Sequence, residues 1–190
     1  MGNEQSLEVS SKEYQSLVEQ THFNKEEVAK LYSTFKEISA THIDDGKIDF
    51  EEFFKMLGFT NKGFAEKVFD AFDTSPDKVI DFQEFVTGLS HVCNRATLEE
   101  KAKFVFNVYD ADKSGQISKD ELRDVMLQSL GENSSIKLPP QVLDKIINDT
   151  FKKMDLDGNG EISLDEFIAS AKQNPSILNC VSVDINKILQ

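Results

Sequence analysis

Several residue types are scarce in this 190-residue chain, which contains no Trp, two Cys, three His, four Pro and four Met. Cys93 and Cys180 lie far apart with neither a CxxC nor a zinc-type spacing, which favours free thiols in a reducing compartment. The histidines also lack metal-type spacing, and we predict no role for them. No apolar run approaches the roughly 20 residues of a membrane-spanning helix, and no signal-peptide core follows the N-terminus. We therefore expect a soluble, cytoplasmic protein.

Basic residues are outnumbered, because 21 Lys and Arg stand against 34 Asp and Glu and leave a formal net charge of −13. This balance argues against nucleic acid as a partner and against direct attraction to an anionic membrane surface. It suits a protein that binds cations or a basic segment of another protein. The sequence also lacks a nucleophile–base set, a phosphate-binding loop and a zinc motif, so we do not expect an enzyme.

One pattern recurs four times along the chain. An apolar helical stretch leads into a polar loop, then an isoleucine, and four residues later a glutamate followed by Phe or Leu. The isoleucines are Ile48, Ile80, Ile117 and Ile162, and the glutamates are Glu52, Glu84, Glu121 and Glu166. The repeat predicts four helix–loop–helix units between residues 26 and 172.

Two of the loops carry oxygen ligands at alternate positions. "DADKSGQISKDE" at 110–121 and "DLDGNGEISLDE" at 155–166 have Asp at the first and third positions, Gly at the sixth and Glu at the twelfth. Calcium prefers about six to eight oxygens, and a short loop supplies them by turning tightly at the glycine. Both loops match the EF-hand pattern and predict two strong Ca²⁺ sites. The predicted ligands are Asp110, Asp112, Ser114, Gln116 and Glu121 in the first of them, and Asp155, Asp157, Asn159, Glu161 and Glu166 in the second, with Gln116 and Glu161 contributing backbone carbonyls.

The repeat also sets the domain organisation. Residues 1–25 precede a first pair of EF-hands at 26–95, a second pair follows at 96–173, and residues 174–190 form a tail. Helical periodicity on both sides of the loops supports this division. We predict an all-α fold of four EF-hand units in two lobes, with short β pairing between the loops of each lobe.

The loop at 73–84, "DTSPDKVIDFQE", keeps Asp73, Asp77, Asp81 and Glu84 but has Lys78 at the turn position. A side chain there must adopt a left-handed conformation, at a cost of about 1 kcal/mol relative to glycine. Weak calcium binding and a purely structural role in pairing with the preceding loop fit this sequence equally well.

The loop at 39–52, "SATHIDDGKIDFEE", lacks carboxylates at its beginning. Counting back twelve residues from Glu52 places Thr41 first, whereas a loop lengthened by two residues begins at Ser39. In both alignments the candidate side-chain donors are Asp45, Asp49 and Glu52. We interpret this loop as weak or structural, with calcium held through backbone carbonyls as the alternative.

The chain resembles the calcineurin B and calcineurin B-like family of EF-hand calcium sensors over nearly its whole length. "FKEISATHIDDGKIDFEEF" resembles the lengthened first loop of the plant members, in which calcium is held largely by backbone oxygens. "VIDFQEFVTGLS" and "NPSIL" resemble the second hand and the C-terminal segment of that family, and "MGNE" resembles the start of calcineurin B. The chain departs from calcineurin B in having two well-formed loops rather than four, and it lacks the plant-type Phe-Pro-Ser-Phe motif.

The resemblance implies a calcium-binding regulatory protein that controls a protein kinase or phosphatase. In such proteins, ion binding changes helix angles and exposes an apolar groove that grips an amphipathic helix of the partner. The low Met content argues against a promiscuous binder and favours a dedicated partner. A constitutive calcineurin-type regulatory subunit of a phosphatase and a calcium buffer are the alternatives.

Both termini carry further signals. "MGNEQS" presents Gly2 for N-myristoylation once Met1 is removed. One myristoyl chain binds a membrane only marginally, so we expect reversible membrane contact. The tail has the apolar spacing of a short amphipathic helix, which either covers the protein's own groove or packs permanently on the second lobe.

Overall fold

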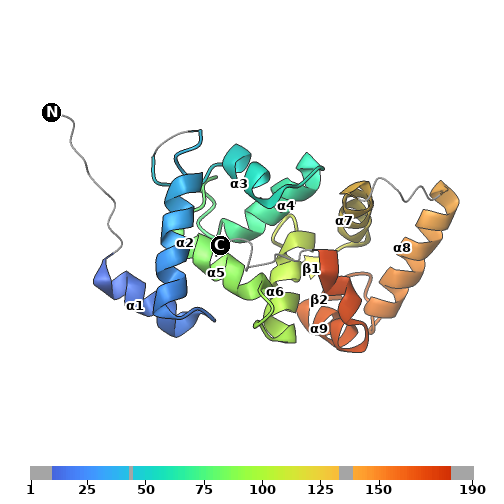
Figure 1. Cartoon of the computed structure of the whole chain (residues 1–190). Coiled ribbons are helices and arrows are strands. Elements are labelled where there is room, and N and C mark those ends of the chain that lie inside the picture. The colour runs from blue at the N-terminus through green and yellow to red at the C-terminus, as the bar shows by residue number, and fades with distance from the viewer. Residues whose placement is uncertain (1–9, 43–44, 133–138, 181–190) are drawn as a thin grey trace.

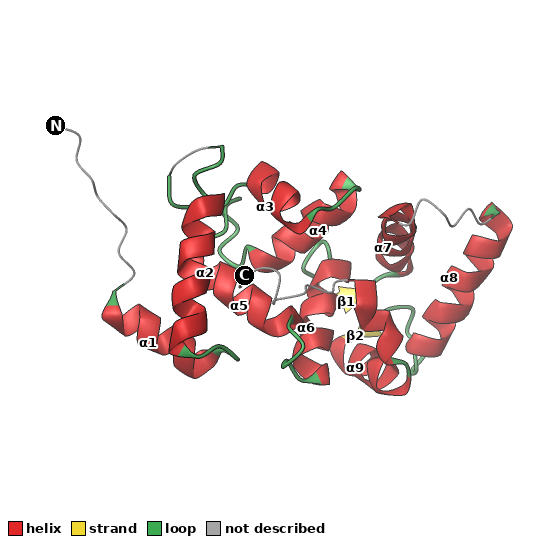
Figure 2. Ribbon diagram, viewed as in Figure 1, coloured by secondary structure: helices red, strands yellow, loops and turns green. Residues whose placement is uncertain are grey.

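The computed structural model describes residues 10–42, 45–132 and 139–180, and most of their regular structure is helical (Figures 1 and 2). In chain order the elements are α1 (Ser11–Gln20), α2 (Lys25–Ile38), α3 (Phe50–Leu57), α4 (Lys62–Phe72), α5 (Phe82–Val92), α6 (Leu98–Tyr109), β1 (Gln116–Ile117), α7 (Lys119–Glu132), α8 (Pro140–Met154), β2 (Ile162–Ser163), α9 (Leu164–Gln173) and a 3₁₀ helix, η1 (Pro175–Cys180). Within the described ranges, no helix combines the length and the apolar character of a membrane span.

Consecutive helices form four hands: α2–α3 (hand 1), α4–α5 (hand 2), α6–α7 (hand 3) and α8–α9 (hand 4). The loops of hands 1 and 2, the N-terminal pair, meet where Ile48 and Ile80 exchange backbone hydrogen bonds of 2.9 and 2.8 Å. The loops of hands 3 and 4, the C-terminal pair, join through antiparallel strands β1 and β2, with Ile117 opposite Ile162. The predicted all-α fold of EF-hands with short β pairing between loops is confirmed.

The exit helix of each hand begins with a reciprocal pair of hydrogen bonds. In hand 1, the N–H of Glu52 donates to Asp49 Oδ1 at 2.9 Å, and the N–H of Asp49 donates to the Glu52 carboxylate at 3.0 Å. The corresponding pairs are Asp81 with Glu84, Ser118 with Glu121, and Ser163 with Glu166. Because each glutamate also ends its loop, the start of the exit helix fixes the carboxylate that faces the loop.

Helix α6 connects the two pairs and lies between them in Figure 1. It packs against α4 and α5 of the N-terminal pair and against α9 of the C-terminal pair. The ring of Phe104 meets that of Phe72 edge-on at 5.2 Å between centroids, and the ring of Phe106 meets that of Phe167 at 5.8 Å. Two aromatic side chains of one helix therefore enter the cores of different pairs and make one continuous apolar core.

Helix α1 precedes the four hands and is not part of the repeat that predicts them. Ser10 caps it through a reciprocal capping box with Glu13, and Leu17 is buried against the rest of the protein. Residues 1–9, which include the predicted lipidation site Gly2, lie outside the described part of the chain.

The first part of the C-terminal tail packs on the C-terminal pair. The 3₁₀ helix η1 contacts α6 and α9, and Leu178 is buried there. The choice between the two interpretations of the tail stays a prediction. The remainder of the predicted amphipathic segment, residues 181–190, is outside the described residues.

The close contact between α4 and α5 generates a stability prediction. A Cβ atom at Gly88 of α5 would overlap the fully buried ring of Phe72. We expect Gly88→Ala to lower the free energy of unfolding by about 1–3 kcal/mol, as overpacking of a core usually does. Gln83→Ala on the exposed face of the same helix should change it by less than about 0.5 kcal/mol. Chemical denaturation measures both, and equal effects of the two substitutions would contradict the prediction.

Candidate metal centres

Three carboxylates converge in hand 3. Asp110 ends helix α6, Asp112 follows in the loop, and Glu121 belongs to the first turn of α7. One carboxylate oxygen of each lies within 4.8 Å of the other two. Closely spaced hard oxygens from carboxylates are the ligands that Ca²⁺ prefers. The structure therefore brings together the three acidic residues that the sequence predicts for this site.

Hand 4 repeats the arrangement with Asp155, Asp157 and Glu166, whose carboxylate oxygens also lie within 4.8 Å of one another. Glu166 is buried, and the N–H of Ser163 donates to its Oε2 at 2.8 Å. This hydrogen bond is the main cause that holds the pKa of Glu166 below its usual value. The closing carboxylate is therefore ionised at neutral pH and acts only as an acceptor.

The tight turn of each loop also orients its first carboxylate. Gly115 and Gly160 adopt φ values of +83° and +90°, a conformation that glycine reaches without steric cost. The N–H of Gly115 donates to Asp110 Oδ2 at 2.8 Å, and that of Gly160 to Asp155 Oδ2 at 3.1 Å. The glycine at the sixth position thus fixes the ligand at the first.

The remaining predicted ligands lie in the same two loops. The Ser114 hydroxyl donates to the backbone carbonyl of Gln116 at 3.0 Å, so these two predicted oxygens of hand 3 are in contact. In hand 4, Asn159 Oδ1 accepts the N–H of Glu161 at 2.8 Å. A hydrogen bond from Ser114 is also the main cause that lowers the pKa of Asp112. The assignment of all ten residues as calcium ligands stays a prediction.

Hand 2 keeps the hydrogen bond from the turn to the first carboxylate although Lys78 replaces the glycine. Lys78 adopts φ +66°, as predicted, and its N–H donates to Asp73 Oδ2 at 3.0 Å. Asp73 is 2% exposed, and its second oxygen, Oδ1, has no hydrogen-bond partner among the described residues. A buried carboxylate oxygen without a donor is costly, and a bound cation would relieve that cost. The framework of hand 2 therefore fits a cation.

A lysine side chain of the neighbouring loop contacts an acidic residue of hand 2. Lys47, from the loop of hand 1, places its Nζ 2.8 Å from Oδ2 of Asp77, the residue at the fifth loop position. Both side chains are 42% exposed, so the pair is weak, but an ion must still compete with the ammonium group for this carboxylate. The Lys47–Asp77 pair and Lys78 at the turn therefore distinguish hand 2 from hands 3 and 4, and the choice between weak calcium binding and a structural role for this loop stays a prediction.

The loop of hand 1 is longer than the other loops. In hand 2, the C-cap of the entering helix is Asp73 and the closing glutamate is Glu84. The same number of residues separates the C-cap from the closing glutamate in hands 3 and 4. In hand 1, Ser39 is the C-cap of α2, where its N–H donates to the carbonyl of Phe35 at 2.9 Å, and the closing glutamate is Glu52. The helix boundary therefore favours the alternative in which this loop begins at Ser39.

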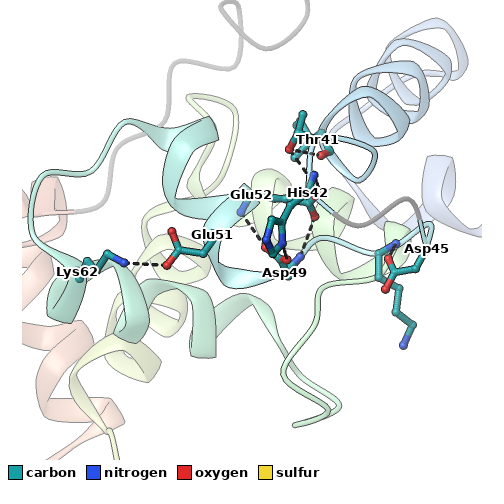
Figure 3. Close-up of polar contacts among 9 residues, drawn as sticks. Thr41, His42, Asp45, Asp49, Glu51, Glu52 and Lys62 are labelled. Carbon is teal, nitrogen blue, oxygen red and sulfur yellow. Dashed lines mark hydrogen bonds and ion pairs between the residues drawn. The ribbon is translucent and has the colours of Figure 1, made fainter.

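The closing glutamate of hand 1 is held by its own loop (Figure 3). The buried Glu52 carboxylate accepts the N–H of His42 and that of Asp49, both at 3.0 Å, and the Thr41 hydroxyl at 3.4 Å. His42 Nδ1 lies 2.6 Å from Asp49 Oδ2. Asp45 Oδ1 accepts the N–H of Lys47 at 3.0 Å. The three candidate donors of hand 1 are thus engaged by the chain itself, and residues 43–44 lie outside the described part.

Comparison with protein families adds an independent observation. Residues 99–172 match the model of an EF-hand domain pair. This range covers hands 3 and 4, in which the carboxylates converge. The chain is therefore an EF-hand protein.

Related proteins narrow the class. Calcineurin B of Candida glabrata is 36% identical over 157 residues, which cover 83% of this chain and 86% of that protein. Human calcineurin B type 2 is 34% identical over 149 residues, covering 78% and 84%. Calcineurin B of Kluyveromyces lactis is 32% identical over 157 residues, covering 83% and 86%. The chain belongs to the calcineurin B family, and it is a calcium-binding regulatory protein.

The two converged carboxylate groups generate a binding prediction. Replacing both Glu121 and Glu166 with Gln removes the charge that closes hands 3 and 4. We expect the double variant to lose the two strongest calcium sites, which in the intact protein should have Kd values of about 10⁻⁷–10⁻⁵ M. Titration calorimetry measures both proteins.

Glu161→Gln is the matched control for this experiment. It removes one negative charge from the loop of hand 4, but the predicted ligand of this residue is its backbone carbonyl. Calcium binding should therefore be retained with two strong sites. If the double variant also keeps two strong sites, the assignment of hands 3 and 4 is wrong.

Proposed function

We propose that this protein is a calcium-dependent regulatory subunit, without catalytic activity of its own, that binds an amphipathic helix of a protein phosphatase or a protein kinase. The convergence of two sets of three carboxylates in hands 3 and 4 is the observation that carries the proposal. We assign these hands as the strong calcium sites and hands 1 and 2 as weak or empty. A phosphatase catalytic subunit is the favoured partner, because the relatives are calcineurin B proteins.

The closing glutamates link the loops to the helices that would respond. Calcium supplies the positive charge that brings the carboxylates of a loop together. Glu121 and Glu166 each belong both to a loop and to the first turn of an exit helix. A glutamate that closes on an ion therefore carries α7 or α9 with it, and the angle between the helices of the hand changes.

Exposed apolar side chains support a helix-binding surface on the C-terminal pair. Leu127 of α7 is 40% exposed, and Val142 and Ile146 of α8 are 43% and 39% exposed. The two helices pack against each other, and residues four apart on α8 share one face. These side chains fit the apolar face of a partner helix, and the net charge of −13 favours one with a basic rim.

Two alternatives predict different behaviour. A constitutive subunit holds its partner equally well with and without calcium. A calcium buffer hardly changes its helix angles on binding an ion, so a dye that reports exposed apolar surface would show little response to calcium.

We also propose that Gly2 is N-myristoylated and that the protein is cytoplasmic, with reversible membrane contact through this lipid. The N-terminal "MGNEQS" supports the modification, because it presents Gly after the initiator Met and Ser at the preferred distance. A single myristoyl chain gives only marginal affinity for a membrane, so the partner or a second signal must strengthen the contact.

Partner binding tests the main proposal. We expect the intact protein to bind a calcineurin catalytic subunit at least about tenfold more tightly with calcium than with a chelator, the scale of ordinary coupling between two sites. Ile146→Asn should weaken the complex by about tenfold or more, because an apolar side chain no longer enters the interface. Surface plasmon resonance measures both effects.

Lys145→Ala on the same helix is the control, because it alters an exposed polar position next to Ile146. Its affinity should stay close to that of the intact protein. Equal binding with calcium and with chelator would identify a constitutive subunit and overturn the calcium switch. Failure to bind the catalytic subunit in either condition would remove the phosphatase assignment.

The lipid proposal is tested separately. In a eukaryotic cell, we expect Gly2→Ala to move the protein from the membrane fraction to the soluble fraction, because alanine is not an acceptor for myristate. Mass spectrometry of the mature N-terminus reports the modification directly. A free or acetylated Gly2 in the unmodified protein would exclude the lipid but leave the calcium-binding function intact.

A further inference from the structure

Side chains of α4 and α7 join the two pairs of hands at a second place, apart from α6. Lys67 Nζ of α4 lies 2.9 Å from Asp124 Oδ2 of α7. Asn61, which caps the start of α4, donates from Nδ2 to the backbone carbonyl of Gln128 at 3.2 Å. Gln128 Nε2 in turn donates to Asp124 Oδ1 at 3.0 Å. We call this group, together with Gly63, the interlobe latch.

Gly63 explains how the two helices come so close. A Cβ atom at this position would lie 3.3 Å from the side-chain amide of Gln128. That distance is tighter than ordinary van der Waals contact, so a methyl group at residue 63 would require the Gln128 side chain to shift by a few tenths of an ångström. The Lys67 side chain is only 16% exposed although it carries a charge, whereas that of Asp124 is 50% exposed, so the ion pair lies at the edge of the α4–α7 contact.

The latch lies on the face of α7 that also carries the closing ligand of hand 3. Glu121, Asp124 and Gln128 follow one another at spacings of three and four residues, so they line one side of the helix. The position of α7 in which the latch is formed is also the one in which Glu121 faces Asp110 and Asp112 within 4.8 Å. The same placement of the helix satisfies both sets of contacts.

We propose that the interlobe latch positions α7 for ion binding in hand 3 and couples this site to the N-terminal pair. Asp124 and Gln128 are positioning residues, which act on the ion through Glu121. The partner element on the other side is α4, which enters hand 2 and ends at Asp73. The latch thus connects the exit helix of hand 3 directly to the entering helix of hand 2.

The coupling acts in both directions. If the latch raises the affinity of hand 3, an ion in hand 3 must strengthen the α4–α7 contact by the same factor. Events at α4, such as occupation of hand 2, then change calcium binding in the other pair without any shared ligand. This inference rests on the proposed calcium site of hand 3.

Lys67→Ala in the full chain tests the proposal, because two physical effects predict opposite signs. Removal of a positive charge from an acidic protein strengthens cation binding if only long-range electrostatics act. Loss of the latch weakens it, and we expect the calcium affinity of hand 3 to fall about three- to fivefold, the upper range for an exposed ion pair and the lowest end of coupling between sites. Affinity is measured by calcium titration against a competing chelator, with the NMR signals of the Gly115 and Gly160 amides reporting hands 3 and 4 separately.

Lys62→Ala is the matched control. Lys62 lies on the same helix and carries the same charge, but its ion pair at 2.7 Å is with Glu51, inside the N-terminal pair. Calcium binding in hand 3 should be unchanged or slightly tighter in this variant. Gly63→Ala is a second, charge-neutral test, and it should also weaken hand 3, because its methyl group requires a shift of the Gln128 side chain, which hydrogen-bonds to Asp124.

The outcomes separate the latch from the calcium site itself. A larger loss in hand 3 than in hand 4, for both Lys67→Ala and Gly63→Ala, supports the latch. Unchanged or tighter binding of hand 3 in Lys67→Ala, as in the control, overturns it. If the Gly115 signal of the unmodified protein does not respond to calcium, the proposed site of hand 3 is wrong, and the latch proposal falls with it.

Discussion

Each of the four loops depends on its closing glutamate, whose carboxylate is held by backbone N–H groups of the same loop. In every hand, one oxygen of the closing glutamate accepts the N–H of the residue ten positions before it, and the other accepts the N–H of the residue three positions before it. Hydrogen bonds between an ionised carboxylate and backbone N–H groups are stronger than those between neutral groups. They set the path of the loop and the start of the exit helix together, so hand 1 keeps its shape although Thr41 and Ser39 supply no carboxylate.

The four hands differ in the groups that contact the acidic side chains of their loops. In hand 1, the acidic side chains interact with groups of the same loop: His42 contacts Asp49, and loop N–H groups donate to Glu52. Hand 2 keeps a buried oxygen of Asp73 unpaired among the described residues but engages Asp77 with Lys47. Hands 3 and 4 bring three carboxylates together each. The acidic side chains of hand 1 and Asp77 of hand 2 are therefore engaged by groups of the chain itself, whereas the carboxylates of hands 3 and 4 face one another.

Features that depend on local rules are predictable from the sequence. The four hands follow from repeated spacing, and the left-handed Lys78 follows from its place at the sixth loop position. Helix α1 has a local signal too, since Ser10 and Glu13 have capping-box spacing, but no apolar repeat marks it. The length of the first loop has two solutions in the sequence, because the end of α2 is set by packing and not by propensity alone. The contact of His42 with Asp49 and the interlobe latch are not predictable, since they depend on how a loop closes and how distant helices pack.

The distribution of ion pairs leaves the negative charge of the loops in hands 3 and 4 without a basic partner among the described residues. Within the described residues, none of the six converged carboxylates of hands 3 and 4 pairs with Lys, Arg or His. The scarce cations lie elsewhere, and several bridge different elements: Lys47 reaches hand 2, Lys67 reaches α7, and Lys172 of α9 reaches Glu99 of α6. Charges of one sign held within a few ångströms repel one another unless a counter-charge enters. Among the described residues, no basic side chain neutralises these six carboxylates, and oxygen-rich loops of this kind suit a divalent ion as the counter-charge.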